Sequence, residues 1–509
     1  MKSKILKIFT IALLLTGTFS CSDLEETPYS SITTKSFFRF ETDAIATING
    51  IYEGLHTSNF QSLISSRLIV FPGKYSLTRN PTLKQISQYK IDYSQADLNT
   101  YWSTCYDVIN RCNMAIKYIP GIDMTDAKKN EYISEAKWIR AYLYFNLVRL
   151  YGEIPLRINP TELEKDAYLP RTSISEIYNN LIIPDLQFAE KNLPLIGKNG
   201  RIGRGAAPFL LGKVYLTMSG KPMQDASKLE LAKQKIQDVI TNKTQYGYAL
   251  MSRYIDVFPL SADRNQFVAS KELNKELIFI LQQTQTVEGH GNTFSFSYGP
   301  EQSFWSNNAT GGQHQVGFME DLYTLYDATD ERRNVNLVYE YVWRNNPTLK
   351  RVWGKDAPYN DKTRGMCQNK YIDPDQLCCN GDPDIIIYRL ADAYLMLAEI
   401  ENEIKGPNTT TYDNLDVILS RARAKLVDRT AAWTKETMRN YIFNERIKEL
   451  NLEFHDIFDL RRLGKVKEAI EFNLGAKAGG TVYDPKFEIY PIPRVEKDVN
   501  PLCTQNPGW

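Results

Sequence analysis

Three acidic residues near the C-terminal end of the chain have a spacing that could do chemistry. Glu445, Glu449 and Glu453 recur at intervals of four residues, which on an α-helix places their carboxyl groups on one face. A glycosidase needs two carboxyl groups about 5–9.5 Å apart, flanking the scissile bond of a sugar. Carboxyl groups on a single face stand on one side of a substrate, so we predict instead that they pair with guanidinium groups and fix the terminal helices. The candidate partners are Arg421, Arg423, Arg446, Arg461 and Arg462.

A segment of different character, SFSYGPEQSFWSNNATGGQHQ, occupies residues 295–315 and places aromatic rings beside side-chain amides. Sugar rings have apolar C–H faces, which flat aromatic rings cover, and hydroxyl edges, which amides bind through hydrogen bonds. Uncharged amides suit an uncharged glycan, because no charge has to lose its hydration. The alternative is that these aromatic side chains form a small core beneath a long loop. The candidate ligand-binding residues are Tyr298, Phe304, Trp305, Asn307 and Asn308, with Gln313 nearby.

A second wall of the same site is expected from FPGKYSLTRN at residues 71–80, which supplies Tyr75, Arg79 and Asn80. Trp353 is a further candidate, together with Trp343 and Tyr359. These assignments rest on residue type and on position in the chain.

Other motifs favour structural roles. GRIGRG at 200–205 lacks the Lys-Ser/Thr pair and the preceding strand of a phosphate loop. The adjacent His455 and Asp456 have no serine or cysteine nucleophile motif beside them. GDPD at 381–384 offers two acids for calcium, but a pair of aspartates in a Pro-Gly sequence is typical of a turn. We therefore assign no catalytic residue, no metal ligand and no cofactor.

The cysteines divide into three groups. Cys105 and Cys112 are seven residues apart on an expected helix, a rise of about 10.5 Å. A disulfide needs Cα atoms within about 7 Å, so we predict two buried thiols. In a polar loop, Cys367 is expected to bridge Cys378 or Cys379, and the pairing stays open. Zinc is a poor alternative there, since neither a second CxxC nor a histidine pair is present.

The third group is Cys21 at the end of an N-terminal export sequence. Three lysines precede an apolar run from Ile8 to Leu15, and small residues lead up to Cys21. The run is too short to span a bilayer, which takes roughly 20 residues, and the order is typical of a signal peptide. We predict that residues 1–20 are removed and that Cys21 carries a lipid anchor. The alternative is an ordinary signal peptide followed by a free cysteine.

Charge and composition exclude some classes of protein. Without the three lysines of residues 1–20, 58 basic residues remain against 60 acidic ones. A nearly neutral chain lacks the positive field on which nucleic-acid binding depends. The chain is 43% apolar and long enough for a large core.

Apolar residues at helical spacing predict a mainly helical scaffold, and small residues at packing positions suggest tetratricopeptide-like helix pairs. The predicted helices are 101–118, 126–151, 173–192, 206–219, 226–241, 387–405, 411–427 and 434–463. Residues 286–382 break this pattern, since they are rich in glycine, asparagine and aromatic residues. We predict irregular structure with short strands there, because a loop this long in a compact domain is usually functional.

Five blocks of sequence, in order, resemble the SusD/RagB family of nutrient-binding lipoproteins. They are EAKWIRAYLYFNLVRLYGEIPL (135–156), GRIGRGAAPFLLGKVYL (200–216), IIIYRLADAYLMLAEI (385–400), NERIKELNLEFHDIFDLRRLGK (444–465) and PIPRVEKDVNPLCTQNPGW (491–509). The acids Asp23, Glu25 and Glu26 are similar to a surface-sorting signal of such lipoproteins. Two residues depart from the family pattern: Phe454 replaces a common glycine, and Cys503 is unusual in the tail.

The resemblance implies a mainly α, SusD-like fold, in which a tetratricopeptide-like helix-pair scaffold carries a long, irregular, loop-rich ligand-binding region. Residues 21–509 would form one domain, with scaffold at about 36–285 and 385–509 and the binding region at about 286–382. The implied function is non-catalytic capture of oligosaccharides or polysaccharides at the cell surface.

The implied partner is a SusC-like, TonB-dependent outer-membrane transporter, and the implied location is the outer membrane, lipid-anchored and facing the exterior. Two other functions stay open: a glycan-degrading enzyme on a helical fold, and a helical-repeat scaffold for protein interactions. Peptide cargo is also open, and the sequence does not identify the glycan.

Overall fold

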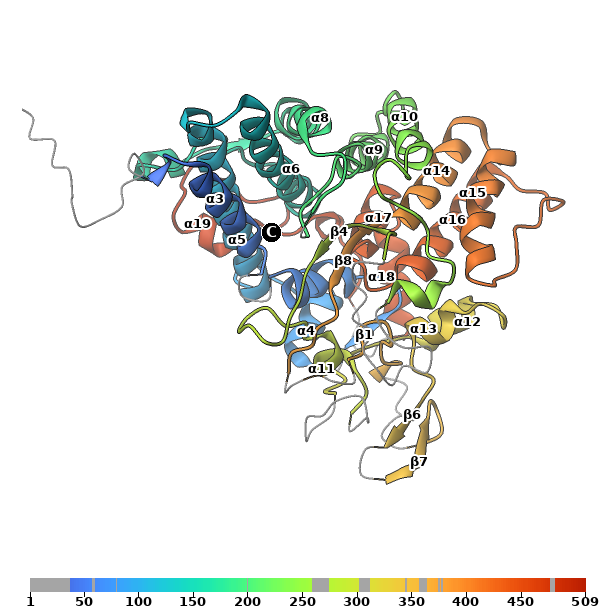
Figure 1. Ribbon diagram of the computed structural model, residues 1–509. Coiled ribbons are helices and arrows are strands. Elements are labelled where there is room, and N and C mark those ends of the chain that lie inside the picture. Colours follow the sequence, from blue (N-terminus) through green and yellow to red (C-terminus); the bar gives the residue numbers. More distant parts are fainter. Residues whose placement is uncertain are drawn as a thin grey trace, which may run out of the picture.

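The computed structural model describes residues 37–509 except 57–59, 79, 199, 259–273, 302–311, 344–345, 357–363, 374–375, 377–378 and 477–480. Most of the described chain is helical. In Figure 1 the helices form the upper part of the molecule, above a region of short strands and loops that ends in the hairpin of β6 and β7.

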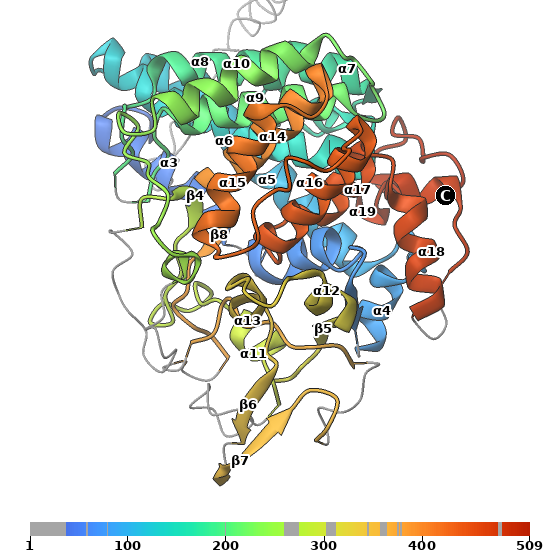
Figure 2. The same cartoon turned by 90° about the vertical axis from the view of Figure 1, so that its right-hand side faces the viewer.

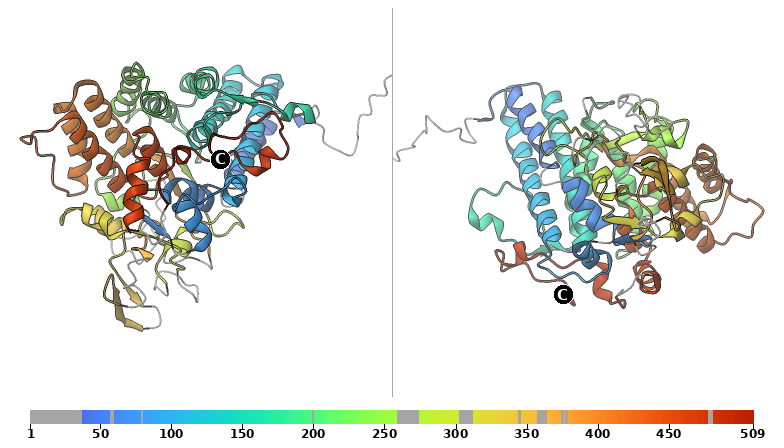
Figure 3. Two further views of the ribbon diagram at one scale, coloured as in Figure 1. Left: turned by 180° about the vertical axis from the view of Figure 1, so that it is seen from behind. Right: turned by 90° about the horizontal axis from the view of Figure 1, so that it is seen from below.

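The longer helices form a row in which each packs on the next. Helix α3 packs on α5, α5 on α6, α6 on α8, α8 on α9 and α9 on α10; α10 packs on α14, which contacts α15 and α16. Their bounds are α3 (Glu41–Gly54), α5 (Ala96–Tyr118), α6 (Asp126–Tyr151), α8 (Ile183–Asn192), α9 (Ala206–Ser219), α10 (Lys228–Thr241), α14 (Leu390–Lys405), α15 (Thr409–Arg421) and α16 (Lys435–Leu450). This neighbour-to-neighbour packing is that of stacked helix pairs, and Figure 3 shows the row from behind and from below.

Shorter helical segments cover the ends and one side of this row. They are η2 (Phe60–Ile64), η3 (Ser66–Val70), α4 (Pro81–Ser87), η4 (Ile119–Gly121), η5 (Glu164–Ala167), α7 (Ile174–Ile177), η6 (Tyr178–Ile182), η7 (Tyr254–Val257), α11 (Phe294–Tyr298), α12 (Glu320–Leu325), α13 (Arg332–Asn336), α17 (Asp456–Arg462), α18 (Val466–Ala476), η10 (Pro485–Glu488) and α19 (Arg494–Lys497).

The loop region enters and leaves the scaffold at one place. Strands β4 (Leu277–Leu281) and β8 (Ile385–Arg389) pair antiparallel, with Leu277 opposite Arg389 and Leu281 opposite Ile385. The chain between them returns to where it left, so α10 and α14 pack as neighbours although 148 residues separate them in sequence. The loop region is thus an insertion into a continuous row of helices.

Three further pairs of strands are present among the described residues, all antiparallel. They are β1 (Ser76–Thr78) with β5 (Val316–Phe318), β2 (Ile154–Pro155) with β3 (Arg171–Thr172), and β6 (Glu340–Trp343) with β7 (Asn346–Val352). The first pair ties the segment before α4 to the loop region. The mainly helical fold with few short strands confirms the predicted fold class.

Aromatic residues of α6 fix the sheet at the base of the insertion. The Trp138 ring lies 4.7 Å from the ring of Phe279 on β4, edge to face, and Tyr142 packs on the same ring at 5.4 Å. The Trp138 indole N–H donates to the carbonyl of Ala206, 3.0 Å away, at the start of α9. Buried aromatic rings contribute large apolar areas, so this contact joins α6, α9 and the sheet.

Helix boundaries follow local signals. Helix α6 begins after Thr125, whose hydroxyl accepts from the backbone N–H of Lys128, and ends at Gly152 with φ +77°. The predicted ranges 126–151 and 206–219 match α6 and α9. The predicted single helix 434–463 is wrong, because the chain breaks between α16 and α17.

The break between α16 and α17 requires left-handed backbone at two residues. Leu452 has φ +61° and Phe454 has φ +64°, a region that favours glycine. Phe454 is the position at which the resembling family commonly carries glycine. Its ring is buried and lies 6.3 Å from the ring of Phe294 in the loop region, so packing compensates for the backbone conformation.

Both cysteines of α5 are fully buried thiols, as predicted. Burial raises the pKa of Cys105 and of Cys112 well above the usual value. Cys367 is buried and Cys379 is half-buried, while Cys378 lies outside the described residues; the predicted bridge in this group stays a prediction.

Within the described part of the chain, no helix combines the length and the apolar character that a membrane crossing requires. Residues 1–20 and Cys21 lie outside the described residues.

The close approach of α9 and α10 gives a first prediction. A Cβ atom on Gly212 would stand 2.5 Å from Cδ1 of Ile236, which is fully buried and therefore confined. We expect Gly212→Val to lower the free energy of unfolding by about 1–3 kcal/mol through overpacking, measured by chemical denaturation. Gly50 on α3 has open space around it, and Gly50→Val should stay within about 0.5 kcal/mol of the parent. Equal effects of the two substitutions would contradict the packing described for α9 and α10.

Candidate functional site

The three glutamates singled out in the sequence lie inside the molecule, where arginines surround them. Glu449 on α16 accepts from Arg389 at the end of β8, 2.6 Å away, and from Arg332 on α13, 3.2 Å away. It also pairs with Arg421 at the end of α15. All four side chains are buried. One carboxylate thus holds together two scaffold helices, the base of the insertion and a helix of the loop region.

Neighbouring acids extend this arrangement, which we call the arginine–carboxylate cluster. Its further members are Glu276, Asp330, Lys370, Glu445 and Glu453. Glu276 pairs with Arg389 (2.8 Å) and Arg421 (2.5 Å). The other ion pairs are Asp330 with Arg332 (2.7 Å), Glu445 with Arg332 (2.9 Å), and Glu453 with Arg389 (2.6 Å) and Lys370 (2.5 Å). Charged groups are this deeply buried only when they are paired and hydrogen-bonded.

The predicted ion pairing of the glutamates is therefore present, but most of the predicted partners are wrong. Of the five candidate arginines only Arg421 pairs with one of the three glutamates among the described residues. Arg446 and Arg462 pair instead with Asp459, which follows the break after α16. The actual arginine partners, Arg332 and Arg389, lie on the insertion and at its base, more than 40 residues before the start of α16.

The cluster does not have the chemistry of a glycosidase. Burial alone would raise the pKa of Glu449, but the guanidinium groups of Arg421, Arg389 and Arg332 hold it well below its usual range. Glu445 and Glu449 expose 1% and 0% of their side chains. A general acid needs a raised pKa and access to the glycosidic oxygen, and neither condition is met.

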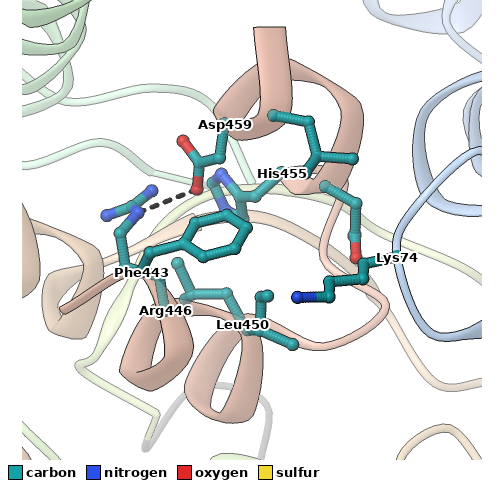
Figure 4. Close-up of a pocket in the computed structure, with 9 residues that line it drawn as sticks. Lys74, Phe443, Arg446, Leu450, His455 and Asp459 are labelled. Atoms are coloured by element: carbon teal, nitrogen blue, oxygen red, sulfur yellow. Dashed lines mark hydrogen bonds and ion pairs between the residues drawn. The ribbon is translucent and has the colours of Figure 1, made fainter. Parts of the chain in front are cut away.

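A small cavity lies between α16 and α17, close to the predicted second wall. Figure 4 shows it with Lys74, Phe443 and Asp459 among its lining residues. Its volume is about 10 Å³, which is enough for about one water molecule and far too little for a sugar. Burial raises the pKa of Asp456, another lining residue, to about 7.

His455, which also lines this cavity, is buried and hydrogen-bonded to another buried side chain. Its Nδ1 accepts from the ammonium group of Lys213, 3.2 Å away, and Lys213 pairs with Asp392 at 2.7 Å. Burial and the charge of Lys213 hold the pKa of His455 well below its usual range. The ring is therefore neutral near pH 7, in agreement with the structural role expected from the sequence.

The loop region lies on the side of the molecule opposite the outer helices. In Figure 2 strands β6 and β7 are at the bottom, while α8 and α10 are at the top. Two backbone pairings attach the loops to one another: the backbone carbonyl of Tyr75 accepts from the backbone N–H of Met319, 2.7 Å away, and Phe318 forms a β-bridge with Met366. The predicted second wall, residues 71–80, pairs through β1 with β5, which directly follows residues 295–315, and the Thr78 hydroxyl donates to the carbonyl of Gln315, 3.1 Å away.

Two of the predicted ligand-binding residues lie in the core. Tyr298 exposes 1% of its surface, donates to or accepts from Ser66 through its hydroxyl (2.9 Å) and packs on Phe71 and Phe294. Trp353 exposes 4%. A buried ring has no face to offer a sugar, so we remove both residues from the candidate site.

Tyr75 and Asn80 are half-buried at the loop side. The Tyr75 ring packs edge to face on Phe472 of α18, 5.6 Å away, and burial raises its pKa to about 12. Asn80 caps α4, since its side-chain oxygen accepts from the backbone N–H of Thr82 at 2.9 Å. That oxygen is committed to the helix, which leaves the amide N–H₂ as the group that Asn80 can offer a ligand.

Five more of the predicted ligand-binding residues lie outside the described part of the chain: Arg79, Phe304, Trp305, Asn307 and Asn308. Tyr359 lies outside it as well, while Gln313 is described and exposed. The residues that flank 302–311 are described. Glu301 and Gly312 form a bridge, and Arg364 pairs with Glu301 at 2.6 Å. The segment thus leaves and rejoins the described structure at one point.

A stack of aromatic residues on the loop region escaped the sequence analysis. The rings of Tyr323 on α12 and Tyr339 lie 5.3 Å apart at an angle of 18°, and the Arg333 guanidinium lies 4.9 Å from the Tyr323 ring. Tyr339 exposes 38% of its surface, and the Tyr323 hydroxyl donates to Asn334. Here an exposed ring and an amide lie together, as carbohydrate recognition requires. The two tyrosines are 16 residues apart and do not share a helix or a strand, so no periodicity in the sequence could reveal the pair.

The two aspartates of GDPD (381–384) accept hydrogen bonds from backbone N–H groups. Asp382 accepts from the backbone N–H of Gln285 at 2.9 Å, and Asp384 from that of Gln283 at 2.8 Å. Nowhere among the described residues do three His, Cys, Asp or Glu side chains come together in a way that would hold a metal ion.

Comparison with known proteins agrees with this architecture. A family model described as the SusD family matches residues 275–509, and one described as starch-binding and associating with the outer membrane matches residues 24–216. The chain belongs to the SusD/RagB family. SusD family members are non-catalytic carbohydrate-binding proteins, and the model that matches residues 24–216 describes proteins that associate with the outer membrane.

Individual relatives cover nearly the whole chain. SusD-like protein P25 of Formosa agariphila is 24% identical over 99% of this chain and 98% of its own. A SusD homolog from Bacteroides thetaiotaomicron is 20% identical and superposes with a TM-score of 0.78 over 94% of this chain and 98% of its own. A laminarin-binding SusD-like protein is 25% identical, with a TM-score of 0.72 over 93% of this chain and 100% of its own.

The arginine–carboxylate cluster gives the second prediction. Glu449→Gln leaves buried guanidinium groups without their shared carboxylate, so we expect the free energy of unfolding at pH 7 to fall by about 3–5 kcal/mol. Because the pKa of Glu449 is lower in the folded chain than its unfolded value of about 4.3, its stabilisation is complete above that value and is lost as the pH falls. The parent should therefore lose more stability than the variant between about pH 5 and pH 3.

Glu340 supplies the control, since it forms an exposed pair with Lys350 at 2.9 Å. Glu340→Gln should change the free energy of unfolding by less than about 1 kcal/mol. Denaturant unfolding across pH measures both variants. A Glu449→Gln protein as stable as the parent would refute the structural role of the cluster.

Proposed function

We propose that this protein captures neutral oligosaccharides on its loop region and delivers them, uncut, to a TonB-dependent outer-membrane transporter. The observation that carries the proposal is the placement of the loop region: a long insertion rich in aromatic and amide side chains, whose two ends meet in one two-stranded sheet on the helical scaffold. The similar SusD-like protein that binds laminarin, a neutral polysaccharide, supports this ligand class.

The candidate contact residues combine those predicted from the sequence with those found in the structure. Trp305, Phe304, Asn307 and Asn308 remain candidates from residue type, with Arg79 on the second wall. Tyr75, Asn80 and Tyr339 are described and at least partly exposed. Ring faces would cover the apolar C–H surfaces of a sugar, and amides would bind its hydroxyl groups.

Two alternatives differ in what they require. An enzyme requires an accessible acid pair, which the buried glutamates of the cluster do not supply. A protein-interaction scaffold would use the row of helices and leave the loop region without a ligand. A peptide could replace the glycan as cargo, and a ligand screen distinguishes these cases.

We infer the route to the cell surface from the sequence. Residues 1–20 direct export, Cys21 carries the lipid, and residues 21–509 form one domain on the exterior face of the outer membrane. Several acyl chains contribute about 0.8 kcal/mol for each buried CH₂ group, which is enough to hold a protein that does not span the bilayer.

The third prediction tests glycan binding. We expect the purified protein to bind laminari-oligosaccharides in isothermal titration calorimetry and to leave their chain lengths unchanged in chromatography. Trp305→Ala should weaken binding about tenfold or more, as for a central aromatic contact, with an unchanged thermal midpoint. As a matched control, Trp433 lies between α15 and α16, and Trp433→Ala should leave affinity unchanged.

Three results would contradict the proposal. New reducing ends would favour an enzyme. Loss of the fold in Trp305→Ala would make that residue part of the core. Failure to bind any member of a broad glycan panel, with co-purification of a transporter, would favour the scaffold.

The fourth prediction tests the anchor. Cys21→Ala removes the thiol that would be acylated, so the exported and processed variant should leave the membrane fraction on cell fractionation. Metabolic labelling with a fatty acid should mark the parent and not the variant. Full retention of the processed variant in the membrane would refute acylation at Cys21.

A further inference from the structure

Two of the four histidines of the chain form a stacked pair between the scaffold and the loop region. His56 follows the end of α3, and His290 follows β4 at the start of the loop region. Their rings lie 4.9 Å apart at an angle of 22°. In Figure 1 α3 lies at one end of the row of helices, and β4 lies near the middle. The histidine pair therefore joins the first long helix of the row to the insertion.

The histidine pair is more accessible to solvent than the other two histidines. His314 and His455 expose 3% and 5% of their surface, and both are hydrogen-bonded in the core. His56 and His290 are half-buried. Histidine is the side chain whose ordinary pKa lies closest to neutral pH, so this pair is where a proton from solvent meets a histidine most readily.

The contacts of His56 favour its unprotonated form. Its Nδ1 lies 3.4 Å from the side-chain nitrogen of Gln283, and that nitrogen also lies 3.4 and 3.3 Å from the carbonyls of Leu281 and Gln282. An amide nitrogen only donates, so Nδ1 accepts and carries no proton. A proton on Nδ1 would set two donors against each other. Burial and the neighbouring His290 lower the pKa of His56.

One carboxylate faces the histidine pair. The Nε2–H of His290 donates to Glu53 of α3, 3.1 Å away, and 55% of the Glu53 side chain is exposed, so water screens its charge. On α5, which packs on α3, Arg111 pairs with Asp107 at 2.8 Å. Glu288 in the same loop as His290 is exposed. Two protonated rings would therefore share a single, solvated counter-charge.

The segment that carries His290, residues 283–290, is closed on itself and tied to both ends of the insertion. The backbone N–H of Thr284 donates to the carbonyl of His290 at 2.8 Å. The backbone N–H groups of Gln283 and Gln285 donate to Asp384 and Asp382, which precede β8. A change at the histidine pair is thus transmitted to the base of the loop region.

We propose that the histidine pair is a pH-sensitive contact, which holds residues 283–290 against the end of α3 when it is unprotonated and releases them when both rings are protonated. Two stacked cations repel each other, and a protonated His56 loses its bond from Gln283. The pKa of His56 is lower in the closed contact than its unfolded value of about 6.5. The contact is therefore fully closed above that pH, and it opens as the pH falls below it.

Hydrogen exchange measured by mass spectrometry at pH 7.5 and pH 5 tests the contact, with rates divided by the intrinsic rate at each pH. We expect residues 283–290 to exchange about tenfold or more faster at pH 5, because one proton bound about 1.5 pH units below 6.5 changes an equilibrium by up to about 30-fold. Peptides of α9 and α10 should keep their protection. Equal protection of 283–290 at both pH values, or equal loss of protection in α9 and α10, would overturn the proposal.

Variants separate the charge from the packing. His290→Phe keeps an aromatic ring beside His56 and removes one titrating group, so residues 283–290 should stay protected at pH 5. Glu53→Gln removes the counter-charge and should increase their exchange at pH 5. Glu288→Gln is the matched control, since it makes the same change on an exposed acid of the same loop, and it should behave as the parent. Persistent pH-dependent release in His290→Phe would contradict the proposal.

Nuclear magnetic resonance of the histidine ring protons measures the coupling directly. In His290→Phe the titration midpoint of His56 should move to higher pH, because a neighbouring charge that opposes its protonation is gone. His314 and His455 supply internal reference signals, since both lie in the core. An unchanged midpoint of His56 in a folded His290→Phe protein would show that the two rings do not interact and would overturn the proposal.

Discussion

The shared carboxylate of Glu449 is the interaction on which the arrangement of this molecule depends most. The loop region is an insertion whose two ends meet in one short sheet, and a two-stranded sheet is marginally stable by itself. Arg389 at the end of that sheet, Arg332 in the insertion and Arg421 on α15 all reach the same acid. Buried ion pairs contribute little net stability compared with apolar packing but enforce a geometry strongly, since losing one partner leaves a costly buried charge. The cluster thus fixes the direction in which the loops leave the scaffold.

Much of the scaffold could be predicted from the sequence because its signals are local. The range of α6 follows from apolar spacing, the Thr125 cap and Gly152, and all three lie within or next to the helix. The same holds for α9 and for the buried thiols of α5. The helix expected over 434–463 failed where a local rule was broken: Leu452 and Phe454 adopt left-handed backbone without being glycine. Family resemblance marked Phe454 as unusual, but only the structure shows the conformation behind it.

The candidate site was less predictable because burial and pairing there are long-range properties. Tyr298 has the residue type of a sugar platform, yet α11 turns its ring into the core against Phe71. The aromatic stack of Tyr323 and Tyr339 depends on how α12 packs beside the following loop, and no period links the two positions. The partners of the glutamates were missed for the same reason, since Arg332 and Arg389 belong to segments that only the insertion brings close. Composition marked the candidate ligand-binding region, while only the fold shows which of its side chains face outward.

We assign the proposed carbohydrate capture to the loop region and support to the row of helices. The central claim is that a neutral glycan binds the loops and leaves the scaffold unchanged. Hydrogen exchange measured by mass spectrometry with and without laminari-oligosaccharide tests that claim most directly. The account predicts protection of peptides from residues 71–80 and 286–318, with exchange in α8, α9 and α10 unaltered and the oligosaccharide intact. Protection confined to those helices, or shortening of the oligosaccharide, would contradict it.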